Sequence, residues 1–236
     1  MNKNSRKVVL DTETTGMNSS GPVYLGHRII EIGAIEIINR KITKNYFHTY
    51  INPNRSIDKE AYKVHGISDD FLLNKPKFYE IYKKFVNYIK DSELIIHNSK
   101  FDLGFINYEF SLLKNNTSTV LDYCTVLDTL KLSRKIFPGK KNNLDALCKR
   151  YKINYKRKLH SAILDAKLLA NVYLFMTSSQ KSFFFMKFPK NFLLKNVKKK
   201  LFFKKKYVQK INSEEKILHV NYLKNMKKKS KCLWTK

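Results

Sequence analysis

The order of apolar runs along the first part of this chain most constrains its fold. Three β-rich runs come first, at residues 7–11, 29–38 and 46–51, and turn-forming stretches separate them. Successive strands joined by short connections are typical of an antiparallel meander. We therefore expect the fold to begin with three neighbouring antiparallel strands.

The pattern changes after the third run. Residues 78–90 have helical spacing of apolar side chains, residues 94–97 form a short apolar run, and two further helices are predicted at 102–113 and 125–136. A last helix is predicted at about 160–177, because its apolar side chains recur on one face. This order predicts an α/β domain in which helices flank a mixed sheet, an antiparallel meander plus parallel strands.

The composition changes near residue 178. All seven glycines lie at or before Gly139, whereas residues 181–236 contain 18 lysines and only two acids, Glu214 and Glu215. We therefore expect a folded domain over residues 1–178 and a basic C-terminal tail over residues 179–236. The sequence leaves open whether the tail is disordered or forms short helices on a partner.

The formal net charge of +28 indicates a polyanionic partner such as a nucleic acid. Lys, Asn, Ile, Phe and Tyr are all abundant, however, as an A/T-rich genome would also produce. The charge alone leaves both explanations open.

The three cysteines, Cys124, Cys148 and Cys232, have no CxxC spacing, which argues against a structural zinc site or a disulfide framework. No run approaches the roughly 18 apolar residues of a membrane span. We expect a cytoplasmic protein that does not interact with membranes.

Two carboxylates follow the first apolar run. Asp11 and Glu13 are two residues apart, so an extended chain places both on the same side. Two converging carboxylates repel each other unless a cation lies between them, and oxygen donors favour Mg²⁺ or Mn²⁺. The same pair could instead be a solvated strand end.

Three further polar residues lie at or near the start of predicted helices. Asp102 follows the short strand at 94–97, where it could be a metal ligand or a helix cap. His160 precedes the last helix and Asp165 lies inside it, so the two share a site only if His160 is at or before the helix start. A histidine there could take a proton from water.

Together, Asp11, Glu13, Asp102, His160 and Asp165 resemble the DEDDh family of exonucleases, which have this order of acids and a histidine five residues before the last one. Four longer sequence segments are similar to those of the epsilon subunits of bacterial DNA polymerase III. They are residues 10–17, 64–67, 108–114 and 137–148. The resemblance covers roughly residues 6–180.

This resemblance implies a ribonuclease-H-like fold and a proofreading 3′→5′ exonuclease that releases deoxynucleoside monophosphates from a DNA 3′ end. It implies that the four acids hold two divalent ions, Mg²⁺ or Mn²⁺, and that His160 is the general base. Asp11, Glu13 and Asp165 would also meet the substrate, and Glu60 and His65 would contact its terminal nucleotide.

The tail carries two segments that are similar to docking motifs. Gln180, Phe183 and Phe185 match the Gln-plus-aromatic motifs that bind a sliding clamp. Leu233 and Trp234 lie in a Cys-Leu-Trp ending, which in the epsilon family belongs to the segment that binds the polymerase alpha subunit. A small theta subunit is a further partner that the resemblance allows.

Three alternatives stay open on the residues alone. A stand-alone DEDDh exonuclease trimming RNA would use the same acids, because carboxylates do not select the sugar. A scaffold that has lost catalysis would not need all five residues. A basic nucleic-acid-binding protein without activity would explain the charge but not the acids.

Overall fold

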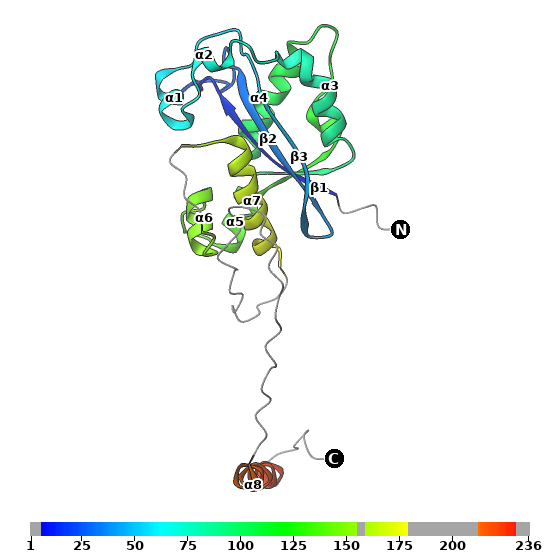
Figure 1. Cartoon of the computed structure of the whole chain (residues 1–236), viewed down its shortest axis with the longest axis vertical. Helices are drawn as coiled ribbons and strands as arrows, with labels where there is room; N and C mark the ends of the chain where they lie inside the picture. Colours follow the sequence, from blue (N-terminus) through cyan, green and yellow to red (C-terminus); the bar gives the residue numbers. More distant parts are fainter. Residues whose placement is uncertain (1–5, 155–158, 179–211, 230–236) are drawn as a thin grey trace, which may run out of the picture. The chain divides into compact units, whose positions relative to one another are not determined.

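The computed structural model describes residues 6–154, 159–178 and 212–229. The chain divides into two compact units, Met1–Ser182 and Phe183–Lys236, and the first contains all the strands of the described part. Figure 1 shows this unit as a twisted sheet with helices on both of its faces.

The sheet has five strands within the described residues, in the order β3-β2-β1-β4-β5. Strands β1, β2 and β3 are antiparallel neighbours, whereas β4 runs parallel to β1 and β5 runs parallel to β4. The strands are β1 Lys7–Thr14, β2 Ile29–Ile38, β3 Lys41–Tyr50, β4 Glu93–Ile96 and β5 Thr125–Asp128. This mixed sheet confirms the predicted fold class, including the meander.

Helices follow the meander and alternate with the last two strands. They are α1 Lys59–His65, α2 Asp69–Leu72, α3 Phe78–Ile89, α4 Ser99–Ser111, α5 Thr129–Ile136, α6 Leu144–Arg150 and α7 Ala162–Met176, with a 3-10 turn at Val120–Asp122.

Alternate residues of β1 enter two different cores. Val8 and Leu10 pack with side chains of α3 and α4, among them Phe85 and Phe105, on one face of the sheet. Val9 packs with Leu169 and its neighbours on α7, on the other face. Because side chains alternate along a strand, Asp11 and Glu13 continue the row of Val9 and lie on the α7 face.

One predicted helix was wrong in its first turn. Residues 125–136 form strand β5 at Thr125–Asp128 and only then helix α5. A four-residue strand is too short to show alternation, and its apolar residues run directly into those of the helix. The boundary is at Asp128, whose side chain accepts hydrogen bonds from the backbone N–H groups of Leu130 (2.8 Å) and Lys131 (3.2 Å).

The second unit contributes one described element, helix α8 at Ser213–Lys229. Asn212 precedes it, and the backbone N–H of Glu215 donates to the Asn212 side chain at 2.7 Å. Four apolar side chains of α8 are exposed: Ile217, Leu218, Val220 and Tyr222.

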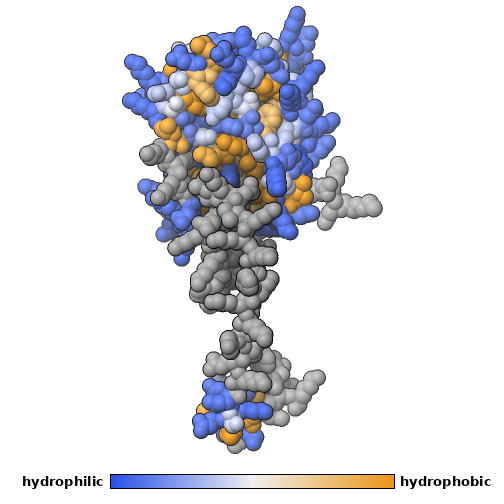
Figure 2. Space-filling model, viewed as in Figure 1, coloured by the Kyte–Doolittle hydropathy of each residue, from blue (hydrophilic) through white to orange (hydrophobic). Residues whose placement is uncertain are grey.

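No helix within the described ranges is long and apolar enough to cross a bilayer. The view in Figure 2 shows a largely hydrophilic surface in which hydrophobic residues form separate patches.

Candidate active site

The carboxyl end of β1 brings its two acids opposite β2. Asp11 pairs with Gly33 and Glu13 pairs with Glu31 in the antiparallel ladder. Paired residues point to the same face of a sheet, so the four positions form one patch facing α7. The prediction that Asp11 and Glu13 share one side of an extended strand is confirmed.

Gly33 lets the start of α7 lie directly against this patch. A Cβ atom at Gly33 would stand 2.2 Å from the backbone nitrogen of Ile163 and 2.3 Å from the carbonyl carbon of Ala162. No side chain fits in that space, and the atoms in the way belong to a helix backbone. The glycine therefore sets the distance between the sheet and the first turn of α7.

The start of α7 carries the second half of the site. His160 lies just before the helix and Asp165 in its first turn, and the Nδ1 of His160 is 3.2 Å from the Oδ2 of Asp165. The backbone N–H of His160 donates to the carbonyl of Val64 (3.0 Å), which ties it to α1. His160 thus stands before the helix start, as a site shared with Asp165 requires.

Asp102 reaches the same region from the other face of the sheet. It lies in the first turn of α4, is 3% exposed, and accepts a hydrogen bond from the hydroxyl of Thr12 at 2.8 Å. Thr12 lies between Asp11 and Glu13 on β1, so this bond fixes α4 to the strand that carries them. Asp102 is therefore held against the acid cluster.

Asp128 positions the helix that carries Asp102. Its carboxylate accepts hydrogen bonds from the backbone N–H groups of Asn98 (3.3 Å) and Ser99 (3.2 Å), at the start of α4, as well as from the start of α5. One side chain at the end of β5 thus caps two helices. Asn98 itself has a left-handed backbone, with φ 67°.

The electrostatics of the cluster favour a cation. Burial raises the pKa of Asp11 well above its ordinary value, and the charges of Asp102, Glu13 and Asp165 raise it further. Burial also raises the pKa of Asp102 to about 7, against the opposing hydrogen bond from Thr12. Ionising all these acids together is costly unless positive charge compensates them.

The donor set fits a divalent ion. One ligand atom each from Glu13, His160 and Asp165 lies within 4.8 Å of the other two, and Asp11 is coupled electrostatically to both acids. Hard cations such as Mg²⁺ prefer carboxylate oxygens. The acids therefore converge as metal ligands would, and a cation there would relieve the repulsion that raises the pKa of Asp11.

The C-terminal end of α1 closes one side of the site. His65 is buried, and its Nδ1 accepts the backbone N–H of Ile67 at 3.0 Å, which leaves the ring proton on Nε2. Among the described residues, that Nε2 has no hydrogen-bond partner. Burial lowers the pKa of His65, and nearby His160 lowers it further, whereas the backbone of Thr14 and the charge of Glu31 oppose the shift.

Glu60, the other residue expected to bind substrate, lies in the first turn of α1 and is exposed. The docking residues expected in the tail lie outside the described residues: Gln180, Phe183, Phe185, Leu233 and Trp234.

Residues 8–173 match the exonuclease family RNase_T, which covers most of the first unit. The DNA polymerase III subunit epsilon of Buchnera aphidicola subsp. Schizaphis graminum is 58% identical over 97% of this chain and 100% of its own length. The chain belongs to the epsilon subunit family of DNA polymerase III. It is a proofreading 3′→5′ exonuclease, and divalent metal ions are part of its chemistry.

A second epsilon subunit supports the same family assignment. The Escherichia coli epsilon subunit is 57% identical over 77% of this chain and 75% of its own length.

Among solved structures, exonuclease X in complex with 5′ overhanging duplex DNA has a TM-score of 0.55 and 25% identity, and the match covers 72% of this chain and 90% of that chain. The nuclease domain of 3′hExo, a DEDDh family member bound to rAMP, has a TM-score of 0.61 and 18% identity, over 74% and 92%, so it shows the shared fold alone.

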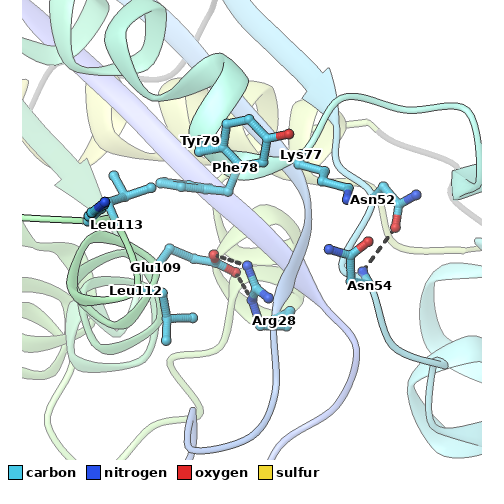
Figure 3. A pocket seen from close by; sticks show the side chains of 10 residues that line it. Arg28, Asn52, Asn54, Lys77, Phe78, Tyr79, Glu109, Leu112 and Leu113 are labelled. Carbon is cyan, nitrogen blue, oxygen red and sulfur yellow. Dashed lines mark hydrogen bonds and ion pairs between the residues drawn. The ribbon is translucent and has the colours of Figure 1, made fainter.

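A separate pocket of about 370 Å³ lies away from this epsilon active site, between the start of α3 and the end of α4 (Figure 3). Its buried acid, Glu109, is fully engaged, because Arg28 donates two hydrogen bonds to it, at 2.8 and 2.7 Å. Ile29 adds a backbone N–H at 3.1 Å. Glu109 therefore has a structural role beside this pocket.

Three residues that shape the epsilon site were not predicted from the sequence: Glu31, Gly33 and Asp128. Each acts on an element far away in the sequence, and only the capping of α5 by Asp128 is a local role. For Glu31 and Gly33 the available signals were two acids, Glu31 and Glu36, and one glycine inside the otherwise apolar run at 29–38, since a buried acid needs a partner and a strand glycine often marks a close approach.

Proposed function

We propose that Asp11, Glu13, Asp102 and Asp165 hold two divalent ions, Mg²⁺ or Mn²⁺, and that His160 is the general base for hydrolysis at a DNA 3′ end. The observation that carries this proposal is the convergence of Glu13, His160 and Asp165 within 4.8 Å, beside an Asp11 whose pKa is raised by its acidic neighbours. The product released at each step is one deoxynucleoside monophosphate.

Bound divalent ions would polarise the scissile phosphate and stabilise the charge that develops on the attacking and leaving oxygens. The chain supplies the carboxylates from three separate elements, β1, α4 and α7, so that their spacing is fixed by the packing of the fold. Asp11, Glu13 and Asp165 would also meet the terminal phosphate.

His160 has the features of a general base. Its side chain is 45% exposed, so water and substrate can reach it, and Asp165 lies 3.2 Å from its Nδ1 and can orient the ring. The backbone bond to Val64 holds the residue at the edge of the site. We assign it the removal of a proton from the attacking water.

His65 and Glu60 would contact the terminal nucleotide. The Nε2–H of His65 is a buried donor that makes no hydrogen bond of normal geometry in the described residues, although the backbone of Thr14 acts on the ring, and a sugar or phosphate oxygen would supply a well-placed acceptor. Glu60 would approach from the exposed side of the same helix. Substrate binding on α1 would also act on His160, through the Val64 bond.

The exonuclease would work within the replicative polymerase. Leu233 and Trp234 would dock the polymerase alpha subunit, Gln180, Phe183 and Phe185 would bind the sliding clamp, and a theta subunit is a further candidate partner. Exposed apolar side chains on α8, such as Ile217 and Leu218, support a docking role for the tail. Cys124 and Cys148 are buried and are not in a disulfide, which fits a reducing cytoplasm.

The test is cleavage of a 5′-labelled single-stranded DNA and the matching RNA by the purified full chain. With Mg²⁺ we expect a ladder that shortens from the 3′ end of the DNA, no ladder with EDTA, and none with Asp11→Ala. The matched control is Glu36→Gln, a buried acid on β2 that is bound by Arg6 at 2.8 Å and lies away from the cluster. Preferential trimming of the RNA would contradict the DNA assignment, and an active Asp11→Ala would contradict the site.

A further inference from the structure

Glu31 is a fifth acid beside the four predicted ones, and it is completely buried. It is 0% exposed on β2, pairs with Glu13 across the ladder, and lies two residues before Gly33 on the face that α7 covers. Its charge helps to raise the pKa of Asp11, so in isolation it disfavours an ionised cluster. A buried carboxylate in such a position needs partners that compensate its burial.

Both carboxylate oxygens of Glu31 are already used. The Oε1 is 2.8 Å from the Nε2 of His48 and accepts the hydroxyl of Ser161 at 3.0 Å, while the Oε2 accepts the backbone N–H of Ala162 at 3.1 Å. Two of these three donors stand at the start of α7. Glu31 is therefore held by three groups of the protein itself, from β3 and from the start of α7.

Glu31, rather than Ser161, caps the N-terminus of α7. Ser161 occupies the N-cap position, but its side chain makes no capping bond and donates to Glu31 instead. The first free N–H of the helix, at Ala162, is satisfied by the same carboxylate. A negative charge at a helix N-terminus is also favoured by the helix dipole.

The capped turn is the one that carries the catalytic groups. His160 comes directly before Ser161, and Asp165 donates its backbone N–H to the carbonyl of Ser161 at 2.9 Å. Gly33 allows the helix to approach the sheet closely, whereas Glu31 fixes which N–H and hydroxyl face the strand. A shift of this turn would move His160 and Asp165 together, relative to Glu13.

We propose that Glu31, oriented by His48, is a positioning residue that locks the start of α7 so that His160 and Asp165 meet the acids of β1. It touches neither substrate nor ion. The proposal rests on the roles assigned above to His160 and Asp165. It adds a residue through which β2 controls the rate of the reaction.

The test compares Glu31→Gln with Glu36→Gln in the full-length chain. Glu36 is the matched control, because it is also a buried acid on β2 and accepts hydrogen bonds from Arg6, Asn45 and Thr43. We expect kcat to fall about 10- to 100-fold in Glu31→Gln, with KM for single-stranded DNA changed less than about threefold. Glu36→Gln should lower the melting temperature but keep kcat within about twofold of wild type.

A double-mutant cycle separates positioning from general loss of stability. In a His160→Ala background, Glu31→Gln should cost a clearly smaller factor in kcat than in the wild type, because the group that it positions is gone. An equal factor in both backgrounds, or a kcat for Glu31→Gln that matches Glu36→Gln, would overturn the proposal. If His160→Ala alone kept the wild-type rate, the proposed function would fail instead, whatever Glu31→Gln does.

A second variant covers the case in which Glu31→Gln does not fold. Ser161→Ala removes the 3.0 Å contact to Glu31 and leaves the buried carboxylate and its other partners in place. We expect kcat to fall about three- to tenfold and the melting temperature to fall less than in Glu31→Gln, because His48 and the N–H of Ala162 still compensate the buried carboxylate. An unchanged kcat in this variant would count against the positioning role in the same way.

Discussion

At the scale of single residues, the site is a set of carboxylates that the fold holds closer together than their negative charges favour. Burial comes first among the causes that raise the pKa of Asp11 and Asp102, and neighbouring charges add to it for Asp11. Such acids bind protons or cations more readily than ordinary surface carboxylates. Bound ions would compensate the repulsion between the ionised, poorly solvated carboxylates. This relief is part of the reason that ions bind there.

Asp102 makes the metal-free chain sensitive to pH. Its folded pKa of about 7 is above its ordinary value of 3.8, so the folded state holds a proton that the unfolded state releases between these values. The stabilisation that this bound proton gives to the folded state is complete below pH 3.8. It is lost as pH rises through 7, and the unfolding free energy falls by up to about 1.4 kcal/mol per pH unit. We expect the unfolding free energy in EDTA to fall over this window, as followed by urea denaturation.

Asp102→Asn is the control for this effect, because an amide cannot ionise. The fall of the unfolding free energy between pH 4 and 7 should be smaller in this variant, and smaller in the wild type with excess Mg²⁺ than with EDTA. An identical pH dependence in wild type and variant would show that Asp102 titrates normally.

At the scale of elements, the site depends on how closely α7 lies on the sheet. A Gly33→Ala methyl group would meet the backbone of Ala162 and Ile163 at about 2.3 Å, where no side chain can move aside. We expect a loss of unfolding free energy at the upper end of the 1 to 3 kcal/mol usual for overpacking, or beyond it. Exonuclease activity should fall as well, because the whole first turn of α7 is displaced.

Gly104→Ala is the matched comparison on α4. Its new methyl group would meet the ring of Tyr24 at 2.7 Å, a side chain that can shift, and alanine favours the helix. Urea unfolding of both variants measures the difference. Equal stability of Gly33→Ala and wild type would mean that α7 does not rest on β2 as described.

The same elements show what the sequence could predict. Asp11 and Glu13 were found because two residues of one strand share a face, and His160 with Asp165 because one helix start carries both. The β5 strand was missed because Thr125–Asp128 is short and merges with the helical pattern of α5. Glu31 lies 130 residues from Ser161, so its role exists only in the packed fold.

At the scale of the whole molecule, we propose that catalysis belongs to the first unit and docking of the alpha subunit to the second. Removing residues 232–236, which include Leu233 and Trp234, should abolish copurification with the polymerase alpha subunit, because the apolar anchors of that segment are lost. Exonuclease activity on single-stranded DNA should stay within about twofold of the full chain, since no site residue is touched. Retention of alpha by the truncated chain would contradict the docking assignment.

The most direct test of the central claim counts metal ions. Free Mn²⁺ is measured by electron paramagnetic resonance during titration of wild type, Asp11→Asn and the control Glu36→Gln, all at neutral pH without DNA. We predict two bound ions per chain for wild type and for Glu36→Gln, and the loss of at least one for Asp11→Asn. Equal binding by all three proteins would contradict the claim that the acids at the end of β1 exist to hold the ions.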